Sequence, residues 1–325
     1  MKRRAFLLAV GALAAPHGFA QKAGTRRIGF LYFGSRQSVM VTGRYAAFIE
    51  GMKALGYVRG RDYVIEERFA DGSSDLVRKQ AVELVELKPQ VILATGNQAV
   101  EELQRATRSI PIVVTVGGDP IARGFAASLA RPEGNVTGLY ISNTELQAKQ
   151  LELLRTVLPK LARVAVLSNP GNGGHAALVK ALRGTAAKAK LEVITAEART
   201  ALEIERGISA AARERAQALL ILGDAFLVQQ ARQIAELGIQ HRLAVVAAVR
   251  EFADAGALMT YGENVTENFR LAADYVDKIL RGARPGDLPF GRSQRLYLVI
   301  NRSAFKALGL AVPRELVLRA DRVIE

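Results

Sequence analysis

The chain has 325 residues and a mass of 35.1 kDa, with 50% hydrophobic, 23% charged and 6% aromatic residues. This composition is typical of a globular protein of about two domains, and it excludes a disordered or fibrous chain. The formal net charge is +14 and cysteine is absent, which excludes disulfides, thiolate metal sites, cysteine nucleophiles and a lipid-modified cysteine.

The first 20 residues have the pattern of a cleavable secretory signal. Residues 2–4 are basic, residues 5–15 are apolar, and Pro16 ends the apolar run before the small residues of a cleavage site. An apolar helix of this length covers roughly 16 Å of a hydrocarbon core about 30 Å thick, so no permanent transmembrane anchor is expected. We therefore expect export to the periplasm, with Gln21 first in the mature chain. The route is Sec or twin-arginine, since residues 3–7 fit both signals.

From residue 27 almost to the end of the chain, short runs rich in Val, Ile, Leu and Phe alternate with amphipathic runs. This is the pattern of βα units on a parallel sheet. The expected strands are 28–33, 63–69, 91–95, 112–116 and 136–141, then 164–168, 191–195, 218–222, 244–248 and 257–260. The expected helices are 42–55, 74–87, 98–108, 145–158, 174–189, 202–215 and 226–237. Glycine after an apolar run predicts helix ends at Gly56 and Gly238.

Two sets of about five βα units predict the α/β class, with two similar Rossmann-like lobes whose parallel sheets are flanked by helices and joined by a hinge. The chain is expected to cross between the lobes near Ser142. A long amphipathic helix at 265–280 is expected to return to the first lobe, and a strand at 295–300 follows. We assign residues 21–141 and about 264–290 to the first lobe, and 142–263 and about 291–325 to the second. A cleft between lobes is the default ligand site.

Most signatures of enzymes and nucleic-acid-binding proteins are absent from the sequence. Histidine occurs only at positions 17, 175 and 241, without the i, i+4 spacing of a zinc-binding helix, so no metal is expected. Neither a G-x-S-x-G elbow nor a G-x-x-x-x-G-K-[ST] phosphate loop is present. The positive charge is spread along the chain without a basic block, so no nucleic-acid partner is expected. Attraction of an anionic ligand is another use of that charge.

Residues 171–176, GNGGHA, match the dinucleotide-binding pattern G-x-G-x-x-A between an expected strand and an expected helix. The element lies in the middle of the chain, follows Asn169-Pro170, and belongs to a chain expected to be exported. A glycine-rich turn that begins a helix at the cleft is therefore favoured. A nucleotide site remains the alternative.

A series of segments spread over the mature chain carries a family resemblance. In chain order they are FIEGMKALGY (48–57), IPIV (110–113), GDP (118–120), SLARPEGNVTG (128–138), AARERA (211–216), REF (250–252), YG (261–262), ADYVDKILRG (273–282) and ALGL (307–310). With them the chain resembles the ABC transporter substrate-binding protein family that includes tryptophan- and tyrosine-binding members. The resemblance implies a type I periplasmic-binding-protein fold, without a cofactor, that closes on a small solute and presents it to an inner-membrane permease. Where relatives often have Asn-Pro-Ala-Asn-Pro, residues 169–173 read NPGNG.

Ligands of open α/β sheets meet the loops at the carboxyl ends of the strands, and two facing lobes offer two such rows. The candidate ligand-binding residues are therefore Phe33, Gly34, Ser35, Thr95, Gly96, Asn97, Gly118 and Asp119 in the first lobe, and Asn169, Asp224, Arg250 and Tyr261 in the second.

Several of these candidates, with the neighbouring Tyr32 and Phe226, can be assigned a role from their chemistry. Helix-preceding amides near Gly96 and Gly118 favour a carboxylate, and Asp119 or Asp224 suits an ammonium group. Tyr32, Phe33, Phe226 or Tyr261 suits a ring. The structural alternatives are a helix cap at Thr95 or Asn97, a turn at Asp119, core packing at Tyr32 or Phe33, and an ion pair of Arg250 with Glu251 or Asp254.

The sequence thus predicts an exported, monomeric solute-binding protein that is not an enzyme. Its expected ligand is an amino acid or related carboxylate, with an aromatic side chain possible, and its expected partner is an ABC permease. A sensor subunit for a membrane signalling receptor is one alternative, and a nucleotide-binding α/β enzyme is another. A regulator's effector domain is disfavoured because a signal-like segment, rather than a helix-turn-helix, precedes Arg27.

Overall fold

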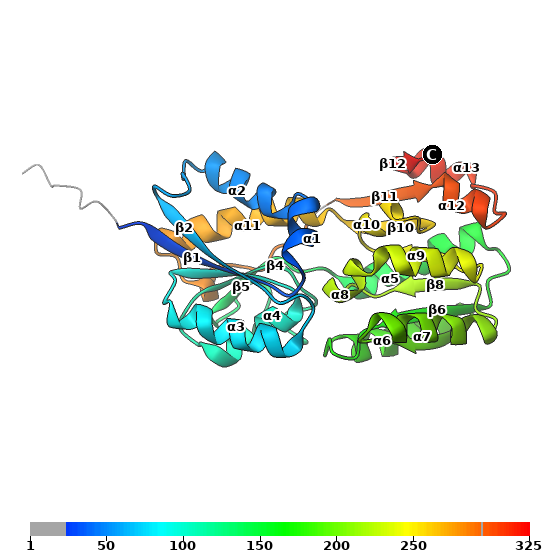
Figure 1. Cartoon of the computed structure of the whole chain (residues 1–325), viewed down its shortest axis with the longest axis horizontal. Helices are drawn as coiled ribbons and strands as arrows, with labels where there is room; N and C mark the ends of the chain where they lie inside the picture. The colour runs from blue at the N-terminus through cyan, green and yellow to red at the C-terminus, as the bar shows by residue number, and fades with distance from the viewer. Residues whose placement is uncertain (1–23, 294) are drawn as a thin grey trace, which may run out of the picture.

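The computed structural model describes residues 24–293 and 295–325, which form two α/β lobes lying side by side (Figure 1). The predicted signal at residues 1–20 lies outside these residues. Each lobe has one sheet with helices on both faces, so each sheet separates two hydrophobic clusters. The predicted fold class is confirmed.

The first lobe contains a parallel five-stranded sheet in the order β2-β1-β3-β4-β5. Strands β1, β3, β4 and β5 are largely buried on both faces, as the runs of Val, Ile and Leu predict, whereas the edge strand β2 is mostly half-buried. The elements in chain order are β1 (Arg26–Tyr32), α1 (Arg36–Val41), α2 (Arg44–Ala54), β2 (Tyr63–Phe69), α3 (Ser74–Glu86), β3 (Val91–Thr95), α4 (Asn97–Ala106), β4 (Ile112–Val116) and β5 (Val136–Gly138). Helices α3 and α4 cover one face of this sheet, and α2 covers the other.

The long helix α11 (Val265–Leu280) comes after the strands of the second lobe but packs beside α2 on the first. Gly51 of α2 makes this close approach possible. A Cβ at Gly51 would lie 2.8 Å from the Cβ of Ala273 and from the backbone oxygen of Arg270. Figure 1 shows the two helices lying together on the same side of the sheet.

The second lobe contains a seven-stranded sheet in the order β12-β11-β10-β9-β8-β6-β7. All neighbours are parallel except β10 and β11. Its first elements are α5 (Asn143–Val157), β6 (Arg163–Ser168), α6 (His175–Lys188), β7 (Glu192–Glu197), α7 (Ala201–Arg213), β8 (Ala218–Ile221), α8 (Ala225–Gln229), α9 (Ala231–Gln240), β9 (Ala244–Ala247), α10 (Glu251–Asp254) and β10 (Met259–Glu263). After α11 and the 3₁₀ turn η1 (Pro285–Asp287) follow β11 (Leu296–Asn301), α12 (Arg302–Ala307), α13 (Arg314–Arg319) and β12 (Arg322–Ile324).

Among the described residues the chain passes between the lobes three times: from β5 to α5, from β10 to α11, and from η1 to β11. Several short crossings restrict relative motion to rotation about this region, in contrast to a single flexible tether. None of the helices in the described ranges is long and apolar enough to span a bilayer.

The predicted helix end at Gly56 is confirmed, since Gly56 has a left-handed φ of 89° after the last residue of α2. The predicted end at Gly238 is wrong, because α9 continues to Gln240. Gly238 is instead required for packing, since a Cβ there would lie 2.2 Å from Cγ2 of Val245. The expected helix at 226–237 is divided at Gln230 into α8 and α9.

Candidate functional site

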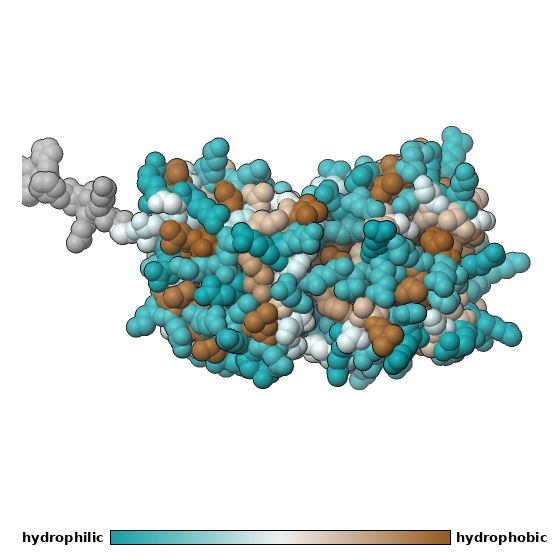
Figure 2. Space-filling view, in the orientation of Figure 1, coloured by the Kyte–Doolittle hydropathy of each residue, from teal (hydrophilic) through white to brown (hydrophobic). Residues whose placement is uncertain are grey.

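Two adjoining cavities lie between the lobes, at the carboxyl ends of the central strands. The smaller has a volume of about 90 Å³ and the larger about 650 Å³. Both are lined by Asn97, Gly118, Ile141, Asn143 and Gly223, so they form one continuous cleft. Figure 2 shows the lobes meeting at a narrowed waist, with hydrophobic residues scattered over both lobes.

Residues of both lobes line each cavity. The smaller is also lined by Tyr32, Arg44, Thr95, Gly96, Gln98, Val116, Gly117, Asn172, Asp224, Ala225, Val228, Ala248, Val249 and Val265. The larger is also lined by Glu101, Arg105, Asp119, Ala122, Arg123, Tyr140, Ser142, Thr144, Gly173, Gly174, His175, Ala177, Leu178 and Ala181.

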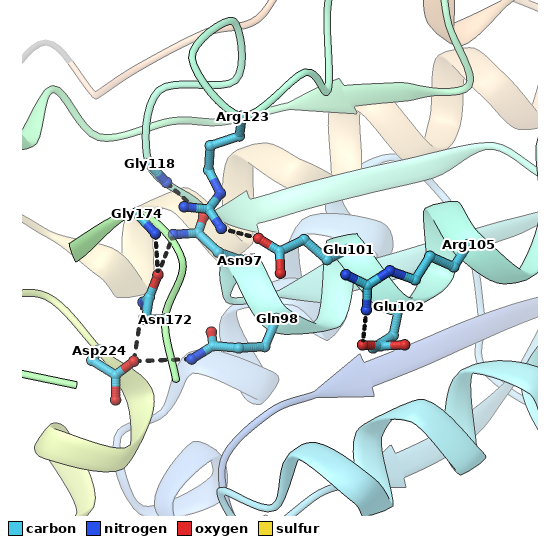
Figure 3. A network of polar contacts seen from close by, with 10 residues as sticks. All are labelled: Asn97, Gln98, Glu101, Glu102, Arg105, Gly118, Arg123, Asn172, Gly174 and Asp224. Atoms are coloured by element: carbon cyan, nitrogen blue, oxygen red, sulfur yellow. Dashed lines mark hydrogen bonds and ion pairs between the residues drawn. The ribbon is translucent and has the colours of Figure 1, made fainter. Parts of the chain in front are cut away.

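Asp224 is the most connected polar group of the smaller cavity, and its residue is only 6% exposed. It follows β8 and caps α8, with Oδ1 accepting from the backbone N of Phe226 at 2.9 Å and of Leu227 at 3.3 Å. Asn169 Nδ2 donates to the same oxygen at 3.1 Å. The other oxygen, Oδ2, accepts from Gln98 of the first lobe at 3.1 Å and from Asn172 at 3.0 Å (Figure 3). This carboxylate therefore contacts both lobes.

Asn97, the first residue of α4, and Asn172, in the turn before α6, form a second contact between the lobes. Asn97 Nδ2 lies 3.3 Å from Asn172 Oδ1, and Asn97 Oδ1 accepts from the backbone N of Gly118 at 2.9 Å. Asn172 Oδ1 also accepts from the backbone N of Gly174 at 3.3 Å. Together with Gln98 and Asp224, these residues form the continuous network drawn in Figure 3.

The glycine-rich residues 171–176 form a turn that leads into α6, in agreement with the favoured prediction. His175 fixes this turn to β6 and β8. Its Nδ1 accepts from the backbone N of Asn169 at 2.9 Å, and its Nε2 donates to the backbone oxygen of Gly223 at 3.2 Å. Only the neutral imidazole can make both bonds, and burial lowers the pKa of His175, as this arrangement requires.

Thr95, Gly96 and Asn97 place the amino end of α4 at the smaller cavity, as the sequence predicts for the residues after β3. The Thr95 hydroxyl is buried and lies 2.6 Å from that of Thr115, so it also has a structural partner. Gly96 precedes the helix with a φ of 92°, a conformation that favours glycine. The helix dipole adds positive potential at this end.

The predicted residues Phe33, Gly34 and Ser35 serve the core of the first lobe. Phe33 is buried among the side chains of α3 and α4, and Ser35 caps α1 by accepting from the backbone N of Ser38 at 3.2 Å. Gly34 packs against Tyr32, since a Cβ there would lie 2.6 Å from the tyrosine ring. Of the two neighbouring aromatic residues, it is Tyr32 that lines the cavity.

Three further predicted residues lie at or outside the edge of the cleft. Asp119 is exposed and its Oδ1 accepts from the backbone N of Ile121 at 2.9 Å, while it also lines the larger cavity. Arg250 is exposed, lies 3.8 Å from Asp254, and lines a third cavity, which adjoins the smaller one at Ala248, Val249 and Val265. Tyr261 packs against the second-lobe core and likewise lines a different cavity. Asn169 reaches the site through Asp224 rather than by lining the cleft.

Sequence reasoning missed several residues that join the lobes or line the cleft. Arg44 of α2 forms an ion pair with Glu251 of α10 at 2.6 Å, with side chains 6% and 18% exposed. Its position one helical turn before the buried Phe48 was the available signal, because an arginine on an apolar helix face requires a partner. Gln98 follows the predicted Asn97 and Asn172 lies in the glycine-rich turn, but the contacts of Gln98 to Asp224 and of Asn172 to Asn97 depend on how the two lobes meet.

Arg123, in the segment after β4, is the second missed arginine. Its side chain is 9% exposed, it pairs with Glu101 of α4, and burial lowers its pKa. Its Nε has no hydrogen-bond partner, as is also true of the Nε of Arg44. Across residues 24–293 and 295–325, no group of three or more acidic or histidine side chains could hold a metal ion.

Comparison with known proteins identifies a family and several relatives. Residues 38–324 match the sequence profile of the family described as ABC transporter substrate binding protein. The "Tyrosine-binding protein" of Clostridioides difficile is 26% identical over 265 residues, which cover 81% of this chain and 75% of that protein. A conserved domain protein from Vibrio cholerae has a TM-score of 0.86 with 26% identity, covering 92% of this chain and 99% of its own. An ABC domain in complex with L-Trp from Streptococcus pneumoniae has a TM-score of 0.85 with 21% identity, covering 92% and 100%.

Proposed function

The chain belongs to the ABC transporter substrate-binding protein family, whose members bind solutes and are not enzymes, and we propose on this basis that it captures an amino acid in the interlobe cleft. We further propose that it delivers this solute to an ABC permease in the inner membrane. The observation that carries the assignment of an amino acid is Asp224, a buried carboxylate at the cavity that contacts both lobes.

Asp224 suits the ammonium group of an amino acid. Its five donors are all neutral amides, so no side-chain cation among its contacts balances the carboxylate. A buried charge without a cationic partner favours a cationic group of the ligand, which replaces one of these neutral donors by a charge-assisted hydrogen bond. The remaining wall of the smaller cavity is largely apolar, with Tyr32, Val116, Ile141, Val228, Val249 and Val265, and it suits a hydrophobic or aromatic side chain.

Binding requires the lobes to separate and close again. The cavity beside Asp224 holds about 90 Å³, whereas ligand sites commonly measure roughly 300–1,000 Å³. Gln98, Asn97 and Arg44 each contact the opposite lobe, so the structure has the lobe contacts expected of a closed state. A solute that contacts both lobes stabilises that state over the open one, and this preference is what couples binding to closure.

The relatives support an aromatic amino acid as the solute. One is named for tyrosine binding and another was solved with L-Trp, and both cover most of this chain. Tyr32 is the aromatic side chain at the cavity that can pack against such a ring.

The proposal also places the protein in the cell. Residues 1–20 act as an export signal, and the mature protein works in the periplasm as a monomer without a nucleic-acid partner. The lobes are residues 21–141 with about 264–290, and 142–263 with about 291–325. Motion occurs at the three crossings between them.

Isothermal titration calorimetry of the purified protein against the twenty amino acids tests this proposal. L-tyrosine, L-tryptophan or L-phenylalanine should bind, and Asp224→Asn should weaken that binding at least tenfold. Asp62→Asn is the matched control, because Asp62 also accepts a backbone amide hydrogen bond, from Val58 at 2.7 Å, but lines neither cavity of the cleft. Binding of a nucleotide with no response to any amino acid would overturn the proposal.

A further inference from the structure

The larger cavity of the cleft has its own polar end, separate from Asp224. Arg123 from the first lobe and the amino end of α6 from the second lobe meet there. A Cβ at Gly174 would lie 2.3 Å from Nη1 of Arg123, and one at Gly173 would lie 3.5 Å from Nη2. The guanidinium therefore lies directly against the two glycines that precede the helix, and their lack of side chains provides the space.

The amino end of α6 has no anionic group of its own. The helix is 14 residues long, its N-cap Gly174 offers no side chain to the first amides, and no acidic residue lies in the first turn. The free amides and the dipole of such a helix end favour an anion. A cationic side chain placed at this end is unfavourable unless an anion lies between them.

Arg123 has donor capacity that the chain does not use. Its side chain is more than nine-tenths buried at the cavity, and its Nε lacks a hydrogen-bond partner. The acidic residues that line this cavity are Glu101, whose charge is balanced by the ion pair with Arg123, and Asp119, whose Oδ1 accepts from two backbone amides. Glu101 Oε1 also lies 3.9 Å from the position of a Cβ at Gly173, so this one carboxylate is shared between the Arg123 guanidinium and the amino end of α6. One carboxylate shared by two positive groups leaves a net positive potential that favours a second anion.

Asn172 connects this end of the cleft to Asp224. Its Nδ2 donates to Asp224 and its Oδ1 accepts from the backbone N of Gly174, so one side chain spans the two ends (Figure 3). An acceptor for a cation and a site for an anion thus lie one side chain apart. An α-amino acid carries its ammonium and carboxylate groups on the same carbon atom, so its two charges suit two neighbouring sites of opposite sign.

We infer that the solute's carboxylate binds in the larger cavity, beside both the Arg123 guanidinium and the amino end of α6, so that each lobe supplies half of a carboxylate subsite. This inference rests on the proposed function, because it takes the solute to be an amino acid with its ammonium group at Asp224. Closure is then coupled to the charge of the ligand, since only the closed lobes bring Arg123 and α6 together. An amine without the carboxylate cannot bind to Arg123 and α6 in this way, so it should stabilise the closed state less than the amino acid does.

The test compares L-tyrosine, its decarboxylated amine tyramine, and the corresponding acid 3-(4-hydroxyphenyl)propionate, with the tryptophan and phenylalanine series measured in the same way. Arg123→Gln should weaken binding of the amino acid at least tenfold and change binding of the amine less than twofold. Asp224→Asn should show the opposite selectivity, by weakening the amine and sparing the acid. Arg68→Gln is the control, because Arg68 forms a comparable ion pair with Glu83 within the first lobe at 3.1 Å, away from the cleft.

The outcomes separate the two proposals. If no amino acid binds the unmodified protein, the proposed function fails and this inference fails with it. If an amino acid binds but Arg123→Gln leaves its affinity unchanged, or weakens the amine equally, only the carboxylate subsite is contradicted. Gly174→Ala, whose Cβ would displace Nη1 of Arg123, should reproduce the loss without removing the charge. Titration with inorganic phosphate and with acetate tests whether the site binds a free anion in place of an amino acid's carboxylate. Saturable binding of either, with no response to amino acids, would also overturn the assignment.

Discussion

Arg44 and Glu251, which are 207 residues apart in sequence, form an ion pair between the first and second lobes at 2.6 Å. Both side chains are largely withdrawn from solvent, so salt screens this pair less than the many exposed pairs on the surface. Arg44 also lines the smaller cavity, which places the pair beside the ligand site. The pair therefore contributes to the balance between open and closed lobes.

Replacement of Arg44 by Gln should shift the protein toward the open state. Removing one partner of a buried polar pair costs about 1–3 kcal/mol, and here the cost falls on the closed state because the lobes separate on opening. We expect a larger radius of gyration by small-angle X-ray scattering without ligand, and weaker amino-acid binding. Arg36→Gln, which removes a mainly exposed arginine 3.6 Å from Glu67, is the control. An unchanged radius and affinity in the Arg44 variant would show that the pair has no effect on closure.

Asp224 has a structural role that can be separated from ligand binding. Asp224→Ala removes the cap of α8 and should lower the free energy of unfolding by about 1–2 kcal/mol. Asp224→Asn retains an oxygen for Phe226 and Leu227 and should be more stable than the Ala variant, although its amide group faces the donors of Gln98 and Asn172. Urea denaturation of the unmodified protein and the two variants measures the order of their free energies of unfolding. Equal stabilities of the two variants would contradict the capping role.

His175 should make stability depend on pH in a defined direction. Burial lowers the pKa of this imidazole below 6.5, so between the lowered value and 6.5 the unfolded chain binds more protons than the folded protein. Stability is therefore complete above about pH 6.5 and is lost as the pH falls through this range. Urea unfolding between pH 5 and pH 7.5 should show this slope, and His175→Gln should reduce it. His241→Gln is the control, and an identical slope in the His175 variant would contradict the assignment.

Gly138, at the end of β5, is required both for its backbone conformation and for its close packing. Its φ is 128°, and a Cβ there would lie 2.3 Å from the backbone oxygen of Val114 on the neighbouring strand. Gly138→Ala should lower the free energy of unfolding by at least about 2 kcal/mol. Gly282→Ala, at a φ of 100° in open space, isolates the conformational cost and should destabilise less. A larger effect at Gly282 would contradict this reasoning.

Local sequence patterns were sufficient for several elements of the first lobe. The strands at 63–69, 91–95 and 112–116 and the helix at 265–280 have the predicted boundaries, because each is a continuous apolar or amphipathic run between turn residues. Gly238 was misread because a glycine that ends a helix and one that permits close packing look alike in sequence. Only the contact with Val245 distinguishes them.

The site was predictable where it follows directly from a parallel strand, and not where it depends on how the lobes meet. Asn97 and Asp224 each lie just after such a strand and meet in one network, as their positions indicate. Tyr261 lies within β10, paired with Leu298 of the antiparallel β11, so the rule for strand ends does not apply to it. Arg44 and Arg123 owe their roles to packing against the other lobe, which no local pattern in the first lobe encodes.

The most direct test of the account is a crystal structure of the protein with the amino acid that binds most tightly in calorimetry. The ligand should lie between the lobes, with its ammonium group hydrogen-bonded to Asp224 and its carboxylate beside Arg123 and the amino end of α6. Its side chain should lie against Tyr32 and the apolar wall. A ligand bound elsewhere, for example in the adjoining cavity lined by Arg250 and Tyr297 and without contact to Asp224, would contradict this assignment.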